Sequence, residues 1–477
     1  MGLVVGAVGM TGTLILIIAG IFIAALLVVL LTAVVLAVFV IRWGEMDAGR
    51  TIAARVLDRM DHDRRRVRRE SMYVTGLFSA LPDEALTALP GALSDVDEID
   101  GVDGAGQPYT LLHHKQAKTI AATFVCAPDG TALQPQDLID SQVSRFGSWI
   151  ASLSKDSAVV GGMVVVDSAL SSSSPLVAKI RSEVSSSAPA VAQQALLEAA
   201  SLMPGSVSMV DAYATVVWSQ TKLDKDIESA AAEIAAKLPD HKEAIYAAGG
   251  GQADTATSED LARMLSVAYR PQRAHEYGTD DLAGHPFHTK VTQAGPEFFD
   301  DSNKRVSYHD GVASMTVMML VPPRMHITET TMETLFSPSD KFLRKRVAIY
   351  YRPLSGAQAV KRAQNLRRGA GFTATTSKGQ TSTFDEHRVK LAKKTEGELV
   401  EGASMTRFML MVTVTFEPTE RSYRDATTRL KSLLDECNLA YRFVEHGSSA
   451  AFHSTLPLGV LPWLYRGSAA LWMEGKI

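Results

Sequence analysis

The sequence predicts an α+β fold in which an N-terminal transmembrane helical hairpin precedes two split-βαβ (ferredoxin-like) blocks. Two observations lead to this prediction. The chain carries no charged residue between Gly2 and Ile41. Strand-like and helix-like segments then alternate twice, in two stretches separated by a polar, turn-rich segment. The expected boundaries are 1–44 for the hairpin, 45–70 for a basic juxtamembrane helix, 71–250 for the first cytoplasmic block, 251–310 for a linker and 311–477 for the second block.

The apolar segment is long enough for two membrane helices, since one helix needs ~20 apolar residues to cross a bilayer. We expect a tight hairpin that turns near residues 19–22; a single long tilted helix is the alternative. A cleaved signal peptide fits poorly, because no basic region precedes the apolar run and the run is too long. Nine arginines follow between Arg42 and Arg69, which by the positive-inside rule places the rest of the chain in the cytoplasm.

Residues 46–70 are predicted to form the juxtamembrane helix. Ile52, Val56 and Met60 recur at four-residue spacing and give the helix an apolar stripe. The arginines are left for lipid phosphates, for solvent or for a partner. We therefore expect a multi-pass protein of the cell membrane whose soluble part lies in the cytoplasm.

The overall composition excludes several other classes. The formal net charge is −4 and hydrophobic residues make up 46%, an ordinary globular mix with no global attraction to nucleic acid or anionic lipid. Cys126 and Cys437 are far apart and lack metal-ligand spacing. Neither a disulfide framework nor a cysteine-based metal site is therefore expected.

The elements of the two blocks follow from hydrophobic periodicity and from β-branched composition. In the first block, strands are expected at 119–127, 158–168 and 206–219, and helices at 134–154 and 188–203. In the second block, strands are expected at 311–323, 345–354, 406–417 and 440–446, and helices at 327–338, 356–368, 385–402 and 419–436. Sheets with helices packed on one face are the expected architecture.

A nucleotide site is not expected. The stretch AAGGGQADTATSED (247–260) offers three glycines and several hydroxyls that could cradle a phosphate. A P-loop also needs a lysine after the last glycine, and no lysine lies near. We interpret the stretch as a linker followed by a helix N-cap at Thr257 or Ser258.

Metal and hydrolase sites are equally weak predictions, and we expect no cofactor and no catalytic residue. Zinc needs three or four converging ligands, whereas the sequence offers only histidine pairs, His113 with His114 and His285 with His288. The stretch HGSSAAFHS lacks the second glycine of a nucleophile elbow. Its hydroxyl and imidazole groups are those of Ser448, Ser449, His453 and Ser454.

A basic stretch between Lys341 and Lys394 is the most specific surface feature. Its candidate contact residues are Arg344, Lys345, Arg346, Arg352, Lys361, Arg362, Arg367 and Arg368. Docking of an acidic partner is the favoured interpretation. Phosphate-driven contact with DNA and a merely solvated helix face are the alternatives.

Several motifs carry a resemblance to a known family. AYRFVEHGSSAAFHSTLPLG (440–459) resembles the junction in the energising ATPases of type IV secretion and conjugation, the TraC, TrbE and CagE kind, where a non-catalytic α+β region meets a RecA-like motor. The order of AGRTIAARV, YVTG, LPGAL, DEIDGVDGAGQPYTLLHH and LARMLSVAYRP resembles integral membrane proteins from conjugative elements of Gram-positive actinobacteria. Members of that family carry a basic tract before the first span, which this chain lacks.

The resemblance implies a type IV secretion membrane subunit fused to the front half of the secretion ATPase, with the motor on a separate polypeptide. The implied function is a non-enzymatic, membrane-anchored platform of a conjugative DNA-transfer machine. Its implied partners are that ATPase, other membrane subunits of the apparatus, membrane lipid, DNA and further copies of itself in a hexamer. Phe452, Leu456 and Pro457 would contact the motor. A type VII-like protein secretion membrane component is the alternative.

Overall fold

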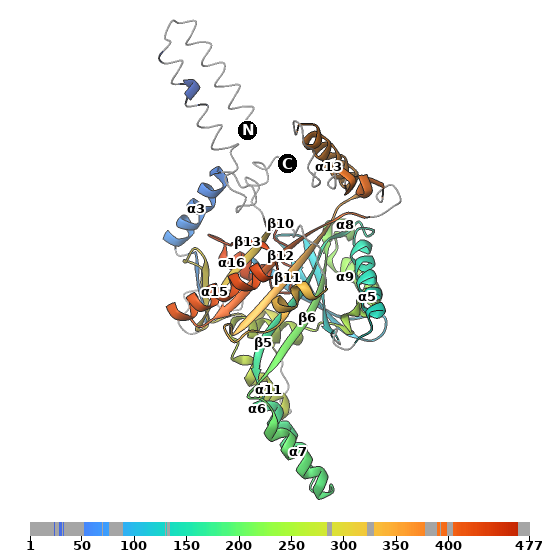
Figure 1. The fold of residues 1–477 in the computed structure, drawn as a ribbon, viewed down its shortest axis with the longest axis vertical. Helices are drawn as coiled ribbons and strands as arrows, with labels where there is room; N and C mark the ends of the chain where they lie inside the picture. The colour runs from blue at the N-terminus through green and yellow to red at the C-terminus, as the bar shows by residue number, and fades with distance from the viewer. Residues whose placement is uncertain are drawn as a thin grey trace.

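The computed structural model describes most of the chain after residue 51. The described residues are 52–68, 70–75, 89–128, 130, 134–283, 289–321, 329–376, 389–391, 393–397 and 404–465, with residues 23, 28–30 and 32 before them. A single antiparallel sheet of 13 strands forms the centre (Figure 1). Its strand order is β1-β8-β9-β10-β12-β11-β5-β6-β4-β3-β2, and β13 and β7 pair with β10 and β4.

The strands have the following bounds. They are β1 (Met72–Val74), β2 (Val96–Val102), β3 (Pro108–His114), β4 (Thr119–Ala127), β5 (Val159–Ser172), β6 (Ser206–Ser219), β7 (Gln252–Thr255), β8 (Phe298–Asp300), β9 (Val306–His309), β10 (Val312–Val321), β11 (Arg344–Pro353), β12 (Thr406–Phe416) and β13 (Ala440–Phe443). The strands predicted at 119–127 and 206–219 are confirmed to the residue.

The main helices are α3 (Ile52–Val67), α5 (Gln136–Ser152), α6 (Ser174–Glu183), α7 (Ala190–Leu202), α9 (Ile227–Ile245), α10 (Ser258–Tyr269), α11 (Arg273–Ala283), α12 (Glu333–Phe336), α13 (Gly356–Thr376), α15 (Glu420–Glu436) and α16 (Ser448–Ser454). Helices α6 and α7 extend away from the sheet at the lower end of the view in Figure 1, and α13 lies at the opposite end. A helix is present within the predicted range 46–70, as α3.

The two halves of the sheet share one connectivity. In the first half, β4, α5, β5, β6, α9 and β7 follow one another, and the strands lie in the order β5-β6-β4-β7. In the second half, β10, α12, β11, β12, α15 and β13 lie in the corresponding order β11-β12-β10-β13. The equivalent strands β5 and β11 pair antiparallel at the centre, so an approximate twofold axis passes between them.

The predicted fold class is wrong in its division into separate blocks. Seven residue pairs, from Lys345 opposite Ser168 to Tyr351 opposite Gly162, join β11 to β5 and make one continuous sheet. The physical reason is that each half would otherwise end in a long unpaired strand. The backbone N–H and C=O groups of β5 and β11 are satisfied when these two strands pair with each other.

The predicted N-terminal transmembrane hairpin is also corrected. No helix among the described residues is both long and apolar enough to cross a membrane. Residues 1–44 themselves lie almost entirely outside the described residues, as does most of the helix predicted at 385–402.

Helices cover both faces of the sheet, not one face as predicted. On one face, α5 and α9 pack over the first half around Phe124, Trp149 and Trp218, while α12 and α15 pack over the second half. The opposite face is covered by α10, α16 and the chain after α16. We call this opposite side the inner face; its cover is made by segments that are far apart in the sequence.

The segment predicted as a linker, 251–310, supplies much of the inner cover. It holds β7, α10, α11, β8 and β9, and most of α10 is buried. The N-cap predicted at Thr257 is confirmed: its hydroxyl accepts from the amide of Asp260, whose carboxylate accepts from the Thr257 amide in return.

Candidate functional site

The structure divides the predicted basic contact residues into two groups. Arg344, Lys345 and Arg346 are buried in β11, where the chain passes through the middle of the sheet. Arg352, Lys361, Arg362, Arg367 and Arg368 are exposed, at the end of β11 and along α13. Only the second group is placed to meet a partner.

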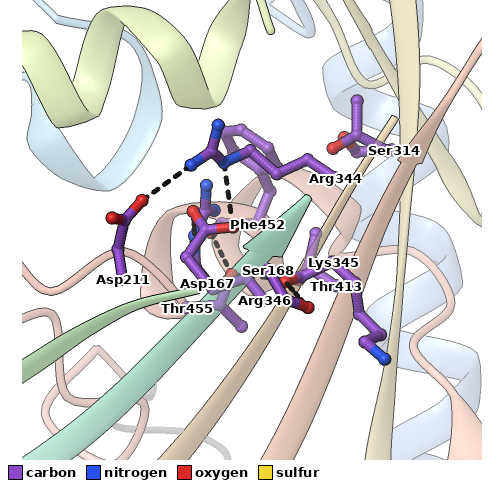
Figure 2. A network of polar contacts seen from close by, with 11 residues as sticks. Asp167, Ser168, Asp211, Ser314, Arg344, Lys345, Arg346, Thr413, Phe452 and Thr455 are labelled. Atoms are coloured by element: carbon purple, nitrogen blue, oxygen red, sulfur yellow. Dashed lines mark hydrogen bonds and ion pairs between the residues drawn. The ribbon is translucent and has the colours of Figure 1, made fainter. Parts of the chain in front are cut away.

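A buried ionic cluster forms where the two halves of the sheet meet (Figure 2). Arg344 Nε donates to Asp167 Oδ1 at 2.9 Å, and its Nη2 donates to Asp211 Oδ2 at 3.1 Å. Arg346 Nε donates to Asp167 Oδ2 at 3.2 Å. Both arginines come from β11 and both aspartates from the neighbouring half, so the cluster ties the halves together beside their backbone pairing.

The electrostatics of the cluster favour the charged form of Arg344. Burial lowers the pKa of Arg344, but the carboxylates of Asp167 and Asp211 outweigh burial and hold the pKa above its usual value. Burial raises the pKa of Asp211 in spite of Arg344. Arg346 stacks over the Phe452 ring, with its central carbon 5.8 Å from the ring centre.

Lys345 points to the opposite face of the sheet, because side chains alternate along a strand. Its ammonium donates to the carbonyl oxygens of Ser337 and Thr334, at the carboxyl end of α12. A cation at this position interacts favourably with the helix dipole. Burial, and then repulsion from Arg429, lower the pKa of Lys345 to about 8.

Raising the pH should therefore stabilise the protein through Lys345. Since the folded pKa lies below the ordinary lysine value, the unfolded chain binds more protons between about pH 8 and pH 10.4, and stability rises across that window. We expect the wild type to gain about 2–3 kcal/mol relative to Lys345→Met over this range. Urea unfolding at several pH values measures the difference. The control is Lys341→Met, which removes an exposed lysine and should show the same rise in the free energy of unfolding with pH as the wild type. If Lys345→Met also showed the same rise as the wild type, the prediction would be wrong.

The exposed basic group lies on a lightly packed helix at the edge of the body (Figure 1). Among the residues of α13 whose burial the structure describes, 356–368, only Ala359 and Ala363 are buried, and Val360 and Leu366 are about half exposed. Arg367 pairs with Glu396 at 2.7 Å. Lys361, Arg362 and Arg368 make no ion pair with any described residue.

Two strand ends extend this surface. Arg352 of β11 lies opposite Arg407 of β12, and Phe408 beside it is 48% exposed. Burial, and then the nearby charge of Arg362, lower the pKa of Arg407. Positive charges therefore crowd one another here, next to apolar side chains. We call this surface, formed by Arg352, Lys361, Arg362, Arg368 and Arg407 with Val360, Leu366 and Phe408, the basic edge.

The junction stretch does not lie on the surface. Phe452, Leu456 and Pro457, the predicted motor contacts, are buried in the inner cover. The chain after α16 crosses the inner face, where Thr123 and Thr215 donate to the Pro457 carbonyl and His114 contacts that of Leu458. As placed here, these residues hold the two halves of the sheet together, and deletion of 448–462 would remove part of the core.

The serine and histidine residues of the junction pack in or against the interior of the protein. His453 is completely buried, with Nε2 2.7 Å from the Tyr269 hydroxyl and Nδ1 3.3 Å from Ser449 Oγ. Burial lowers the pKa of His453 to about 3, so it is a weak base. A general base is most effective when its pKa lies near the working pH.

His113 and His114 are not brought together as a ligand pair. His113 contacts Gln220 on one face of β3, while His114 on the other face contacts Leu458 and Tyr465. His285 and His288 lie outside the described residues. No group of three or more potential metal ligands occurs in the part of the chain that the structure describes.

Sequence reasoning missed the acidic partners of the basic stretch. Asp167 ends a hydrophobic run in β5 and carries no local signal of its role, since it lies 177 positions from Arg344. The alternation in RKRVAIYY was the available signal, because it places Arg344 and Arg346 on the face that also carries Ala348 and Tyr350.

In comparisons with known proteins, no family model matches the sequence and no curated protein is significantly similar to it.

Proposed function

We propose that the chain is a non-enzymatic docking subunit of a conjugative, type IV-like DNA-transfer machine, which binds a separate ATPase at the cytoplasmic side of the cell membrane. The observation that carries the proposal is the basic edge. Lys361, Arg362 and Arg368, which form no ion pair with a described residue, lie there with Arg407 beside exposed apolar side chains. Such a mixture favours a protein partner with acidic and apolar groups, since electrostatic complementarity steers association and apolar contact sustains it.

Helix α3 supports the place at the membrane. Its apolar residues Val56 and Met60 are half exposed or more, and arginines flank them. An amphipathic helix of this kind lies well at a lipid surface, with its apolar stripe toward the acyl chains and its cations toward the headgroups.

Charge reversal at the basic edge should remove the ATPase. We expect Arg362→Glu with Arg368→Glu to lower recovery of a Walker-bearing ATPase about tenfold in affinity purification from detergent-solubilised membranes. The matched control is Lys179→Glu with Arg181→Glu, which reverses two exposed charges on α6 and should leave recovery unchanged. Mass spectrometry of the co-purifying proteins measures both.

Three results would overturn the proposal. One is recovery of a type VII-like export complex in place of a conjugation ATPase. Another is equal recovery by the wild type and the Arg362→Glu, Arg368→Glu variant. The third is loss of binding to duplex or single-stranded DNA in that variant while ATPase recovery stays intact, which would assign the basic edge to DNA.

A further inference from the structure

A second cationic site lies near the β1-β8-β9 end of the sheet, between α3, the turn that joins β8 to β9, and the end of β13. A polar cavity of about 600 Å³ opens there. Its lining includes Arg59, His62 and Arg66 from α3, Lys304 from the turn, and His446 after β13. None of these residues belongs to the basic edge.

The cavity is held in shape by contacts between its three walls. His62 is buried, with Nε2 3.2 Å from the Ser302 carbonyl, and its ring meets that of His446 edge to face at 4.9 Å between centres. Arg65 Nη2 donates to the His446 carbonyl at 3.3 Å. The His446 amide donates to the Lys304 carbonyl at 2.7 Å. Three segments distant in sequence thus converge on one preformed space.

The carboxylates in the lining are already engaged. Arg305 binds Glu445 with 2.6 Å between Nε and Oε1, and Asp63 lies 3.9 Å from Arg59. Arg66 and Lys304 make no ion pair with any described residue. The cavity therefore offers two cations that form no direct ion pair with a described carboxylate, and of the two only Lys304 interacts with the charge of nearby Glu445.

His446 carries an unsatisfied polar atom at the wall of the cavity. Nδ1 of His446 is buried and has no hydrogen-bond partner among the described residues. The residue also adopts a left-handed backbone conformation, with φ of 63°, which is uncommon outside glycine. A buried polar atom of this kind costs stability unless a ligand or an ordered water satisfies it.

We infer that this cavity binds a phosphate monoester, with Arg66 and Lys304 as its principal cationic contacts and the two histidines beside them. A dianionic phosphate matches two unpaired cations, and arginine recognises phosphate oxygens through paired donors. The group can belong to a soluble metabolite or to the headgroup of a lipid. The exposed apolar stripe on α3 lies next to the cavity and could contact a membrane that carries the phosphate on a lipid headgroup. A soluble phosphate monoester could enter the cavity from solvent.

The test uses the full chain and two probes. Glycerol 3-phosphate, titrated by calorimetry, measures binding of a soluble monoester. Flotation with phosphatidylcholine vesicles that carry either phosphatidic acid or phosphatidylglycerol, matched for total charge, measures preference for a monoester headgroup. We expect Arg66→Ala with Lys304→Ala to weaken binding of the preferred probe about tenfold or more, the loss of one to two charge-assisted hydrogen bonds.

The control is Arg64→Ala with Arg68→Ala, which removes one exposed arginine from α3 and one directly after it, both outside the cavity. This control should lower binding to both vesicle types equally and leave the preference for phosphatidic acid and the glycerol 3-phosphate affinity unchanged. The inference is overturned if neither probe binds the wild type specifically, or if both double variants lose specific binding to the same extent.

Discussion

Asp167→Asn is expected to lower the free energy of unfolding by about 3–5 kcal/mol, the usual cost of removing one partner from a buried ionic group. The substitution preserves the shape of the side chain but leaves Arg346 buried without a counter-ion. Arg344 keeps Asp211. Urea unfolding of the full chain measures the change.

Asp211→Asn is the matched control from the same cluster. Because Asp211 is about a third exposed, water can solvate the Arg344 guanidinium where the carboxylate charge is removed. We therefore expect the free energy of unfolding to fall by about 1 kcal/mol or less. Equal losses in the two variants would show that the cluster does not join the halves in the way that the geometry indicates. Added salt should change neither result much, since buried pairs are weakly screened.

Gly459→Ala is also expected to have a large effect and to lower the free energy of unfolding by about 3 kcal/mol. Gly459 has φ of 79°, and a Cβ there would lie 2.3 Å from the Cβ of Ala121 in β4. Left-handed backbone strain and overpacking of the core therefore add together. Thermal and urea unfolding both report the loss, which should come with increased protease cleavage of the chain after α16.

Two further glycines and one suppressor separate the causes. Gly106 has φ of 81° with no atom near its absent side chain, so Gly106→Ala isolates the backbone cost of about 1 kcal/mol. Gly104 is unstrained and open, and Gly104→Ala should be neutral. Ala121→Gly in the Gly459→Ala background should recover the steric part. If Ala121→Gly did not restore stability, the chain after α16 would not pack against Ala121 of β4 as the structure shows.

Local elements could be predicted from the sequence because their signals are local. The β-branched run of β4, the helical spacing of α5 and the hydroxyl at Thr257 each act within a few residues. The joining of the halves could not be predicted in this way. It depends on the pairing of β5 with β11, and neither strand carries a mark that distinguishes an edge from a centre.

The candidate site likewise has features that the local sequence predicts and features that depend on distant residues. The basic character of residues 344–368 is plain in the sequence, but which of its cations reach solvent depends on strand alternation and on a distant aspartate. The cavity beside α3 was not predicted at all, because its walls come from three separated segments with no shared motif. Its one local sign was the arginine-rich helix itself.

The ends of the long sheet have a consequence for how the protein behaves at high concentration. At one end β1 contributes only three residues, and at the other β2 carries Asp97, Glu98 and Asp100 in the sequence VDEIDGV. A short end and an acidic end both discourage a second molecule from adding its strands to the sheet, since like charges would face each other across the new pair. Copies of this chain are therefore not expected to join through backbone pairing at these two ends of the sheet.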